Sequence, residues 1–133
     1  MVKNTHNFKP IEGKYVNLRE VELDDAAFIL KLRCDPKKSR FLHPTENNLE
    51  KQIDYLKRYK TLDNEWYFII ENKAHEPLGT WRIYDVKEDA FTGGSWLMVD
   101  SALVEETMEA DFLGSNYAYN VLGFHKCFFD VIK

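Results

Sequence analysis

Residues 93–132 constrain the fold of this chain more than any other stretch, because they place a helical segment between two apolar runs. The first run, residues 93–100, is nearly all apolar after its two glycines, which is typical of a strand covered on both faces. Residues 105–122 have the length and composition of a helix, and residues 127–132 are again strand-like. This order predicts a βαβ crossover with parallel strands. Ligands of open α/β sheets lie at the carboxyl ends of such strands, so we expect the functional site there.

The preceding segments predict a sheet with helices on its faces. Two amphipathic helices follow the first strand, with Asp24 and Asn48 as their predicted caps, and the first helix ends at Asp35 because Pro36 follows. A polar turn then joins two apolar strands into an antiparallel hairpin. The predicted fold class is therefore α/β (α+β), with a mixed sheet in the order β-α-α-β-β-β-α-β. The predicted elements are strands at 15–21, 66–71, 78–86, 93–100 and 127–132, and helices at 24–35, 48–59 and 105–122.

The length of 133 residues fits one domain with one core. Residues 1–13 are polar and contain Pro10 and Gly13, so we expect a flexible lead-in, with residues 14–133 forming the domain. The lead-in lacks the apolar run of a signal peptide, and the sequence has no apolar stretch long enough to span a membrane. We therefore expect no membrane association and a cytoplasmic location.

Charge and metal-ligand residues exclude several functions. The net charge of −4 argues against non-specific nucleic-acid binding, which needs a basic surface. The four histidines are scattered without the spacing of metal ligands, so no metal site is expected. Cys34 and Cys127 lack CxxC spacing, which favours a reduced, intracellular protein.

Several phrases of the sequence resemble the GNAT superfamily of acyl-CoA-dependent N-acetyltransferases. The likeness is greatest to the branch that acetylates ribosomal-protein N-termini and amino sugars. Residues 117–126, a helix ending in a leucine-glycine-aromatic turn before a strand, are the most specific part. The resemblance covers almost the whole chain and implies a twisted sheet with helices on both faces. The residues that carry it are 13–19, 23–26, 67–71, 77–80, 94–96 and 117–126.

The resemblance also implies a set of site residues. In GNAT enzymes the pantetheine arm of acetyl-CoA pairs with the strand that corresponds to residues 94–100, and its pyrophosphate rests on amides at the start of the next helix. It therefore implies acetyl-CoA as the co-substrate. The residues expected to contact it are Trp96, Leu97, Met98, Val99, Glu106, Thr107 and Met108. Those expected near the acceptor are His43, with a plain turn beside Pro44 as the alternative, and Ser95.

Asp100 and Tyr117 are the candidate catalytic residues. Asp100 ends the strand and would accept the proton of the amine, although acidic residues are common at strand ends. Tyr117 lies two residues from Tyr119 on one helix, so at most one of them faces the cofactor cleft. Core packing is the alternative use for either tyrosine.

The chain departs from the GNAT pattern in two places. The phosphate-loop pattern Q/R-x-x-G-x-G/A should fall near residues 102–107, where this chain has Ala-Leu-Val-Glu-Glu-Thr without a glycine. Glycine matters there because a side chain keeps backbone amides away from phosphate oxygens. The family also continues beyond the strand at which this sequence ends, so the domain is expected to be incomplete. A naturally short protein, a truncated piece or a partner chain that completes the sheet would explain this, and we expect a homodimer or larger assembly that covers Phe128 and Phe129.

Two functions follow from this sequence. The first is an acetyl-CoA-dependent N-acetyltransferase acting on a primary amine of a small molecule, an amino-sugar nucleotide or a peptide N-terminus. The alternative is a catalytically inactive GNAT-like domain that binds acyl-CoA or a partner chain, which the glycine-less loop favours.

Overall fold

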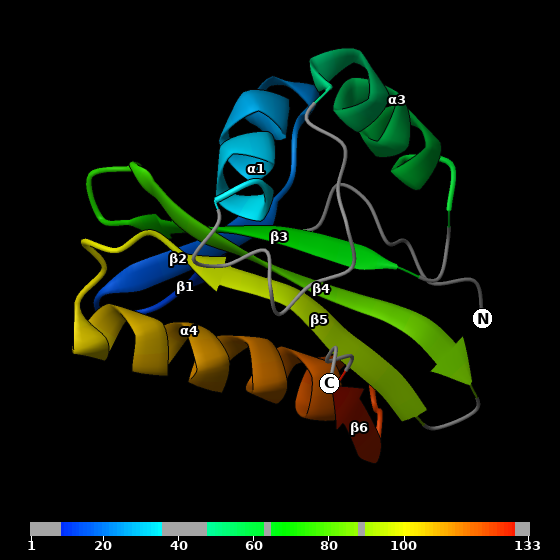
Figure 1. Ribbon diagram of the computed structural model, residues 1–133. Coiled ribbons are helices and arrows are strands. Elements are labelled where there is room, and N and C mark those ends of the chain that lie inside the picture. The colour runs from blue at the N-terminus through cyan, green and yellow to red at the C-terminus, as the bar shows by residue number, and fades with distance from the viewer. Residues whose placement is uncertain (1–8, 36–47, 63–64, 88–89, 130–133) are drawn as a thin grey trace.

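The computed structural model describes residues 9–35, 48–62, 65–87 and 90–129 (Figure 1). His43 therefore lies outside the described residues. In chain order the elements are β1 (Ile11–Glu12), β2 (Val16–Glu20), a 3₁₀ turn (Leu23–Asp25), α1 (Ala26–Arg33), α3 (Leu49–Tyr59), β3 (Trp66–Asn72), β4 (Pro77–Lys87), β5 (Ala90–Met98), α4 (Val104–Asn116), a π-helical turn (Tyr117–Val121) and β6 (Lys126–Phe129).

The strands form a six-stranded sheet in the order β1-β2-β3-β4-β5-β6. All neighbours are antiparallel except β5 and β6, whose parallel pairing confirms the predicted crossover. The predicted order of elements is also confirmed, with one short strand added. That strand, β1, corrects part of the expected lead-in, because Ile11 pairs with Leu18 and Glu12 with Asn17.

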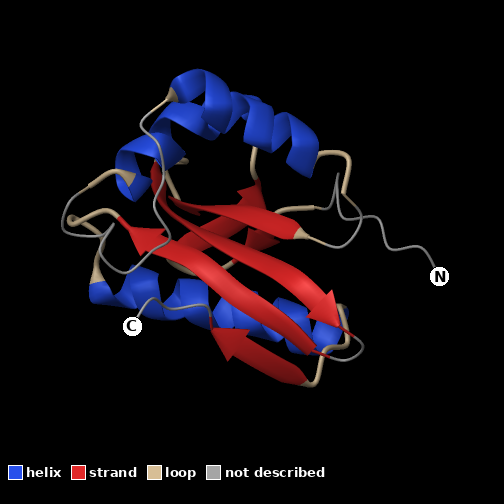
Figure 2. Cartoon of the chain, turned by 45° about the vertical axis from the view of Figure 1, so that its right-hand side comes forward, coloured by secondary structure: helices blue, strands red, loops and turns tan. Residues whose placement is uncertain are grey.

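The helices cover both faces of the sheet, with α1 and α3 on one face and α4 on the other (Figures 1 and 2). Each face has its own buried apolar cluster, so the sheet is the middle of three layers. The cluster between α1, α3 and the sheet consists of Val21, Ala26, Ile29, Leu56, Tyr59, Tyr67 and Ile69. The cluster on the α4 face consists of Val16, Leu18, Trp66, Phe68, Ile70, Leu78, Trp81, Ile83, Phe91, Ala110, Ala118 and Phe124.

The two helix starts agree with the sequence prediction to different extents. Asn48 caps α3 as expected, since its Oδ1 accepts a hydrogen bond from the N–H of Lys51 at 3.1 Å. The prediction for Asp24 is wrong. A 3₁₀ turn precedes α1, and the carboxylate of Asp25, not of Asp24, accepts the N–H of Glu22 at 2.7 Å. Asp25 is buried beneath the turn, whereas Asp24 is exposed.

The predicted single helix over residues 105–122 changes form near its end. α4 stops at Asn116, and the next residues form a π-helical turn in which the N–H of Leu122 donates to the carbonyl of Tyr117 at 2.9 Å. Wider turns of this kind appear mostly as single-turn insertions in helices. Gly123 follows with φ of +82°, a left-handed conformation that glycine adopts without strain. The chain then turns into β6.

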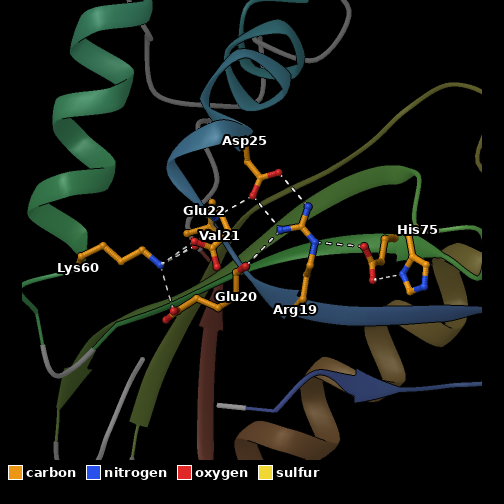
Figure 3. Close-up of polar contacts among 8 residues, drawn as sticks. Arg19, Glu20, Val21, Glu22, Asp25, Lys60 and His75 are labelled. Carbon is orange, nitrogen blue, oxygen red and sulfur yellow. Dashed lines mark hydrogen bonds and ion pairs between the residues drawn. The ribbon is translucent and has the colours of Figure 1, made fainter. Parts of the chain in front are cut away.

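A network of charges ties β2 to the start of α1 (Figure 3). Arg19 donates to both oxygens of Asp25, at 2.8 and 2.9 Å, and its Nε donates to Glu71 at 3.1 Å. Glu71 in turn contacts Nδ1 of His75 at 3.0 Å, so its carboxylate bridges Arg19 and His75. The hydrogen bond with Asp25 raises the pKa of Arg19, which stays charged. Nearby, Lys60 joins the end of α3 to β2 by donating to Glu20 and to the carbonyl of Val21.

A second long-range contact joins α4 to the turn before β2. The carboxylate of Glu109 accepts the backbone N–H groups of Lys14, Tyr15 and Val16, at 2.9, 2.6 and 2.9 Å. Gly13 allows this approach, because a Cβ atom on it would lie 2.4 Å from Oε1 of Glu109. The phrase at residues 13–16 therefore docks the front of the chain onto α4.

Candidate active site

The second half of β5 has an unpaired edge in the described part of the chain. β6 pairs with Ala90–Gly93, and the described residues of β6 end at Phe129, opposite Gly93. From Gly94 to Met98, the pairing seen among the described residues is with β4 on the other side. Backbone N–H and C=O groups along such an edge can pair with an extended ligand.

A β-bulge lies within this unpaired half. Arg82 and Thr80 of β4 are two residues apart, but their partners on β5, Gly94 and Leu97, are three apart. The extra residue therefore falls at Ser95 and Trp96. A bulge bends its strand and re-aims backbone groups, which is why bulges recur beside active sites. Trp96 is 37% exposed, so the strand is not covered on both faces as the sequence suggested.

β5 ends two residues before the predicted boundary, and Val99 and Asp100 lie in the turn that leads to α4. The N–H of Val99 donates to the carbonyl of Leu78 at 2.7 Å, and the N–H of Ala102 donates back to Val99 at 3.1 Å. These bonds fix the turn at the carboxyl end of the strand. Asp100 is exposed on it.

Two cavities flank this turn. The first, which we name the α1 cavity, has a volume of about 350 Å³ and lies between α1 and the turn. Its lining residues are Phe28, Lys31, Leu32, Asp35, Val99, Asp100 and Ser101. The second, the α4 cavity, has a volume of about 390 Å³ and lies between the β3–β4 turn and the start of α4. Its lining residues are Asn72, Glu76, Pro77, Leu78, Val99, Ser101, Leu103 and Glu106.

Side chains of the first turn of α4 form hydrogen bonds with the backbone at the start of this helix. Oε1 of Glu106 accepts the N–H of Leu103 at 2.8 Å, and the hydroxyl of Thr107 donates to the carbonyl of Leu103 at 3.2 Å. Glu106 thus occupies one of the donors that a helix N-terminus offers to an anion. Met108 is exposed on the outer side of the helix.

The comparison with family models decides what this architecture is. A model described as an acetyltransferase (GNAT) domain matches residues 16–130. The chain belongs to the GNAT acetyltransferase family. The mixed sheet and its helices match the GNAT fold, as the sequence predicted. GNAT acetyltransferases use acetyl-CoA as co-substrate.

Solved structures agree with this fold. FdhC, a nucleotide-linked sugar GNAT in its apo form, is 29% identical with a TM-score of 0.81, and the match covers 94% of this chain and 74% of FdhC. A GCN5-related N-acetyltransferase from Brucella melitensis is 19% identical with a TM-score of 0.67, covering 87% and 57%. A variant of the spermidine N-acetyltransferase SpeG from Vibrio cholerae is 12% identical with a TM-score of 0.72, covering 86% and 68%. This chain thus spans roughly three fifths to three quarters of those proteins, and among curated proteins none matches.

The site of this GNAT domain fits one part of acetyl-CoA and not another. The edge at Gly94–Met98, which no described residue pairs, suits the amide groups of a pantetheine arm. The α4 cavity does not suit a pyrophosphate, since its lining holds the carboxylates of Glu76 and Glu106 and no lysine or arginine. An anion placed there would face like charges.

The structure separates the two predicted catalytic residues of the GNAT domain. Asp100 lies at the end of β5, whereas Tyr117 follows the last residue of α4. The thirteen residues of α4, Val104–Asn116, span about 20 Å, so Asp100 and Tyr117 lie beyond opposite ends of this helix. The ring of Tyr117 packs edge-on against Phe68 with centroids 5.7 Å apart, on the α4 face of the sheet, and burial raises its pKa. Core packing, the alternative that the sequence offered, describes its position.

The other predicted site residues lie in different parts of the structure. Trp96, Leu97 and Met98 lie on the unpaired half of β5, and Val99 lines both cavities. Ser95 lies in the bulge, and its side chain falls outside the described part of the chain. Sequence reasoning did not place α1 at the site: Lys31 lies in its last turn, Asp35 follows its end, and both line the α1 cavity.

Within the described residues, no group of His, Cys, Asp and Glu has the arrangement of a metal site. The described helices are also too short or too polar to cross a membrane.

Proposed function

We propose that this GNAT domain transfers the acetyl group of acetyl-CoA to a primary amine. The observation that carries the proposal is the bulged half of β5 at Gly94–Met98, whose outer edge is unpaired among the described residues, beside the α1 cavity. The acceptor classes proposed are small amines, amino-sugar nucleotides and peptide N-termini. FdhC, described as a nucleotide-linked sugar GNAT, and SpeG, a spermidine N-acetyltransferase, support the first two classes.

In the proposed reaction the neutral amine nitrogen attacks the thioester carbon, the C–S bond breaks and the thiolate leaves. A backbone N–H of the bulge would polarise the thioester carbonyl, because the ladder with β4 is interrupted there. Asp100 is the proposed base, since it lines the α1 cavity and can take the amine proton directly or through one water molecule. Tyr117 is not proposed as a catalytic residue, because it packs on the face of the sheet opposite to the α1 cavity.

A second candidate function is a domain that binds acyl-CoA, or a partner chain, without catalysis. The observation that favours it is the α4 cavity, where two carboxylates replace the glycines and cations of a phosphate site. Assembly into a homodimer and a cytoplasmic location remain predictions. Light scattering at micromolar concentration tests the first.

Thermal shift with acetyl-CoA tests the donor site, and release of free thiol in the presence of amines tests the transfer. A donor at one hundred times its dissociation constant stabilises the fold by ~2.7 kcal/mol. We expect Asp100→Asn to lower kcat/KM by about 10²-fold without changing acetyl-CoA binding. Asp111→Asn, on the exposed side of α4, is the matched control and should leave both unchanged. Absence of any shift at millimolar acetyl-CoA would refute the donor site, and a shift without thiol release for any amine would favour the second function.

A further inference from the structure

Arg82 lies in β4 on the face that α3 covers, where tyrosines surround its guanidinium. Its Nη1 donates a hydrogen bond to the hydroxyl of Tyr55 of α3. The guanidinium carbon stands 3.9 Å from the ring centroid of Tyr84 and 5.9 Å from that of Tyr55. These contacts hold the guanidinium plane in one orientation, because cation–π stacking and the hydrogen bond act on different sides of it.

The nearby carboxylate in the described part of the chain is that of Glu65, which lies beyond ion-pair distance: burial lowers the pKa of Arg82, and Tyr55, Tyr67 and Glu65 raise it. The Nε atom is buried and has no hydrogen-bond partner there, and no carboxylate forms an ion pair with the guanidinium. Arg19, in the same sheet, shows the usual arrangement, with carboxylates of Asp25 and Glu71 at 2.8 and 3.1 Å. Removing an arginine from water without an anion is costly, so buried charges are normally paired. The contrast favours Arg82, rather than Arg19, as the guanidinium that takes an anionic ligand.

The shape of the vacant donors specifies the ligand. Nη1 is engaged by Tyr55, which leaves the edge of the guanidinium that carries Nε. Such an edge presents two parallel N–H groups and matches the two oxygens of a carboxylate or phosphate. A cationic group would be repelled by the same atoms.

Arg82 is also close to the place proposed for the thioester. It pairs across β4 and β5 with Gly94, and the bulge begins at the next residue of β5. A Cβ atom on Gly94 would lie 2.8 Å from the ring of Tyr84, so this glycine makes room for the ring on which Arg82 stacks. At a strand rise of about 3.3 Å per residue, the backbone opposite Arg82 lies within roughly 10 Å of the bulge.

We infer that Arg82, oriented by Tyr55 and Tyr84, binds an oxyanion of the acceptor and so selects compact amines that carry a carboxylate or a phosphate. This inference rests on the proposed acetyl transfer for its acceptor, but the anion site itself does not require turnover.

The binding test uses inorganic phosphate as the probe. The Nε–H of Arg82 is buried, so its NMR signal can be assigned as the arginine side-chain signal that disappears in Arg82→Lys. We expect this signal to shift on titration with phosphate, and Arg82→Gln to weaken phosphate binding at least tenfold. Arg58→Gln is the matched control, because Arg58 lies over the ring of Tyr55 at 5.6 Å from an exposed position on α3. Equal phosphate affinity in wild type and in folded Arg82→Gln would overturn the anion site; Arg82→Lys, which keeps the charge, gives the same comparison if Arg82→Gln fails to fold.

The acceptor test compares amines that differ by one anionic group. Glucosamine 6-phosphate against glucosamine tests phosphate, and alanine against alaninamide tests carboxylate. We expect kcat/KM of the wild type to favour the anionic member of at least one pair by tenfold or more, and Arg82→Gln to bring that ratio close to one. A wild type that acetylates both members of each pair equally overturns the inference and leaves the proposed function standing. Phosphate binding that depends on Arg82 in a chain that acetylates no amine supports the anion site and refutes the proposed function.

Discussion

Glu109 offers a perturbation whose effect can be worked out from its contacts. Its Oε1 accepts the N–H groups of Tyr15 and Val16, and its Oε2 accepts that of Lys14. Replacement by alanine removes the anion from all three donors. The Val16 donor is half-buried, so its loss should cost ~1.5 kcal/mol, the lower end of the range for charge-assisted bonds. At the two exposed donors, the N–H groups of Lys14 and Tyr15, water replaces the carboxylate, so the loss of each of these bonds should cost only ~0.5 kcal/mol of stability.

We therefore expect Glu109→Ala to lower the free energy of unfolding by about 2–3 kcal/mol at pH 7, measured by urea denaturation with an unchanged m-value. Glu109→Gln should lose about half as much, because an amide oxygen can keep two of the three bonds while its NH₂ group faces the remaining donor. Glu105→Ala is the matched control. Glu105 lies one turn earlier on α4, is exposed, and has no side-chain hydrogen bond or ion pair to the described residues, so its loss should stay within ~0.5 kcal/mol.

The dependence of this loss on pH gives a second check. Burial alone would raise the pKa of Glu109, but the three backbone donors outweigh it, and the pKa lies below its ordinary 4.5. A depressed pKa means that the carboxylate stabilises the fold fully above pH 4.5, and that this stabilisation is lost as pH falls through the folded-state pKa. The gap between wild type and Glu109→Gln should therefore shrink in acid. Equal losses in Glu109→Ala and Glu105→Ala, or a gap that stays constant down to pH ~3, would refute the reasoning.

Two further substitutions test the packing of α4 and the charge network. Gly114→Ala should destabilise the fold by ~1–2 kcal/mol in thermal or urea unfolding, because a Cβ atom there would lie 2.5 Å from the Trp81 ring and this overpacking outweighs the ~1 kcal/mol gain in helix propensity. Ser115→Ala is the control. A Gly114→Ala variant more stable than wild type would contradict the close contact. Arg19→Met should lower the free energy of unfolding by ~2–3 kcal/mol at pH 7, which is below the full cost of breaking a buried pair because the Arg19 side chain is 26% exposed. Burial alone would raise the pKa of Glu71, but His75 and Arg19 lower it by more, so the net pKa lies below 4.5 and the loss should diminish in acid below that pH. A loss independent of pH would contradict this.

The sequence predicted those features that depend on neighbouring residues. The order of strands and helices, the cap at Asn48 and the parallel pairing of the last strand with the strand before α4 follow from local periodicity, polar turns and the rules of βαβ connections. The misplaced cap at Asp24 shows the limit of this reasoning. Asp24 and Asp25 are equivalent in a sequence pattern, and what distinguishes them is that Asp25 lies beside Arg19.

Features that depend on distant residues could not be predicted. Glu109 binds N–H groups 93 to 95 positions earlier, and Arg19 binds a carboxylate 52 positions later, which no local pattern encodes. The bulge in β5 arises in the same way, from its register against β4. The two candidate catalytic residues, Asp100 and Tyr117, lie beyond opposite ends of α4, and the ~20 Å length of this helix separates them.

The charged residues around β5 differ between the two halves of the proposed site, acidic where the donor would lie and basic where the acceptor would lie. At the carboxyl end of the strand, Glu76 and Glu106 make the α4 cavity unsuitable for phosphates, so the donor must be held mainly by backbone groups along Gly94–Met98. Near the bulge, Arg82 offers a fixed cation, so charge is available for the acceptor. Backbone pairing recognises an extended amide chain whatever its terminal group, whereas a guanidinium fork discriminates between anionic and neutral ligands. A site built in this way has its selectivity on the acceptor side, which is why the acceptor pairs test the role of Arg82 more sharply than donor analogues would.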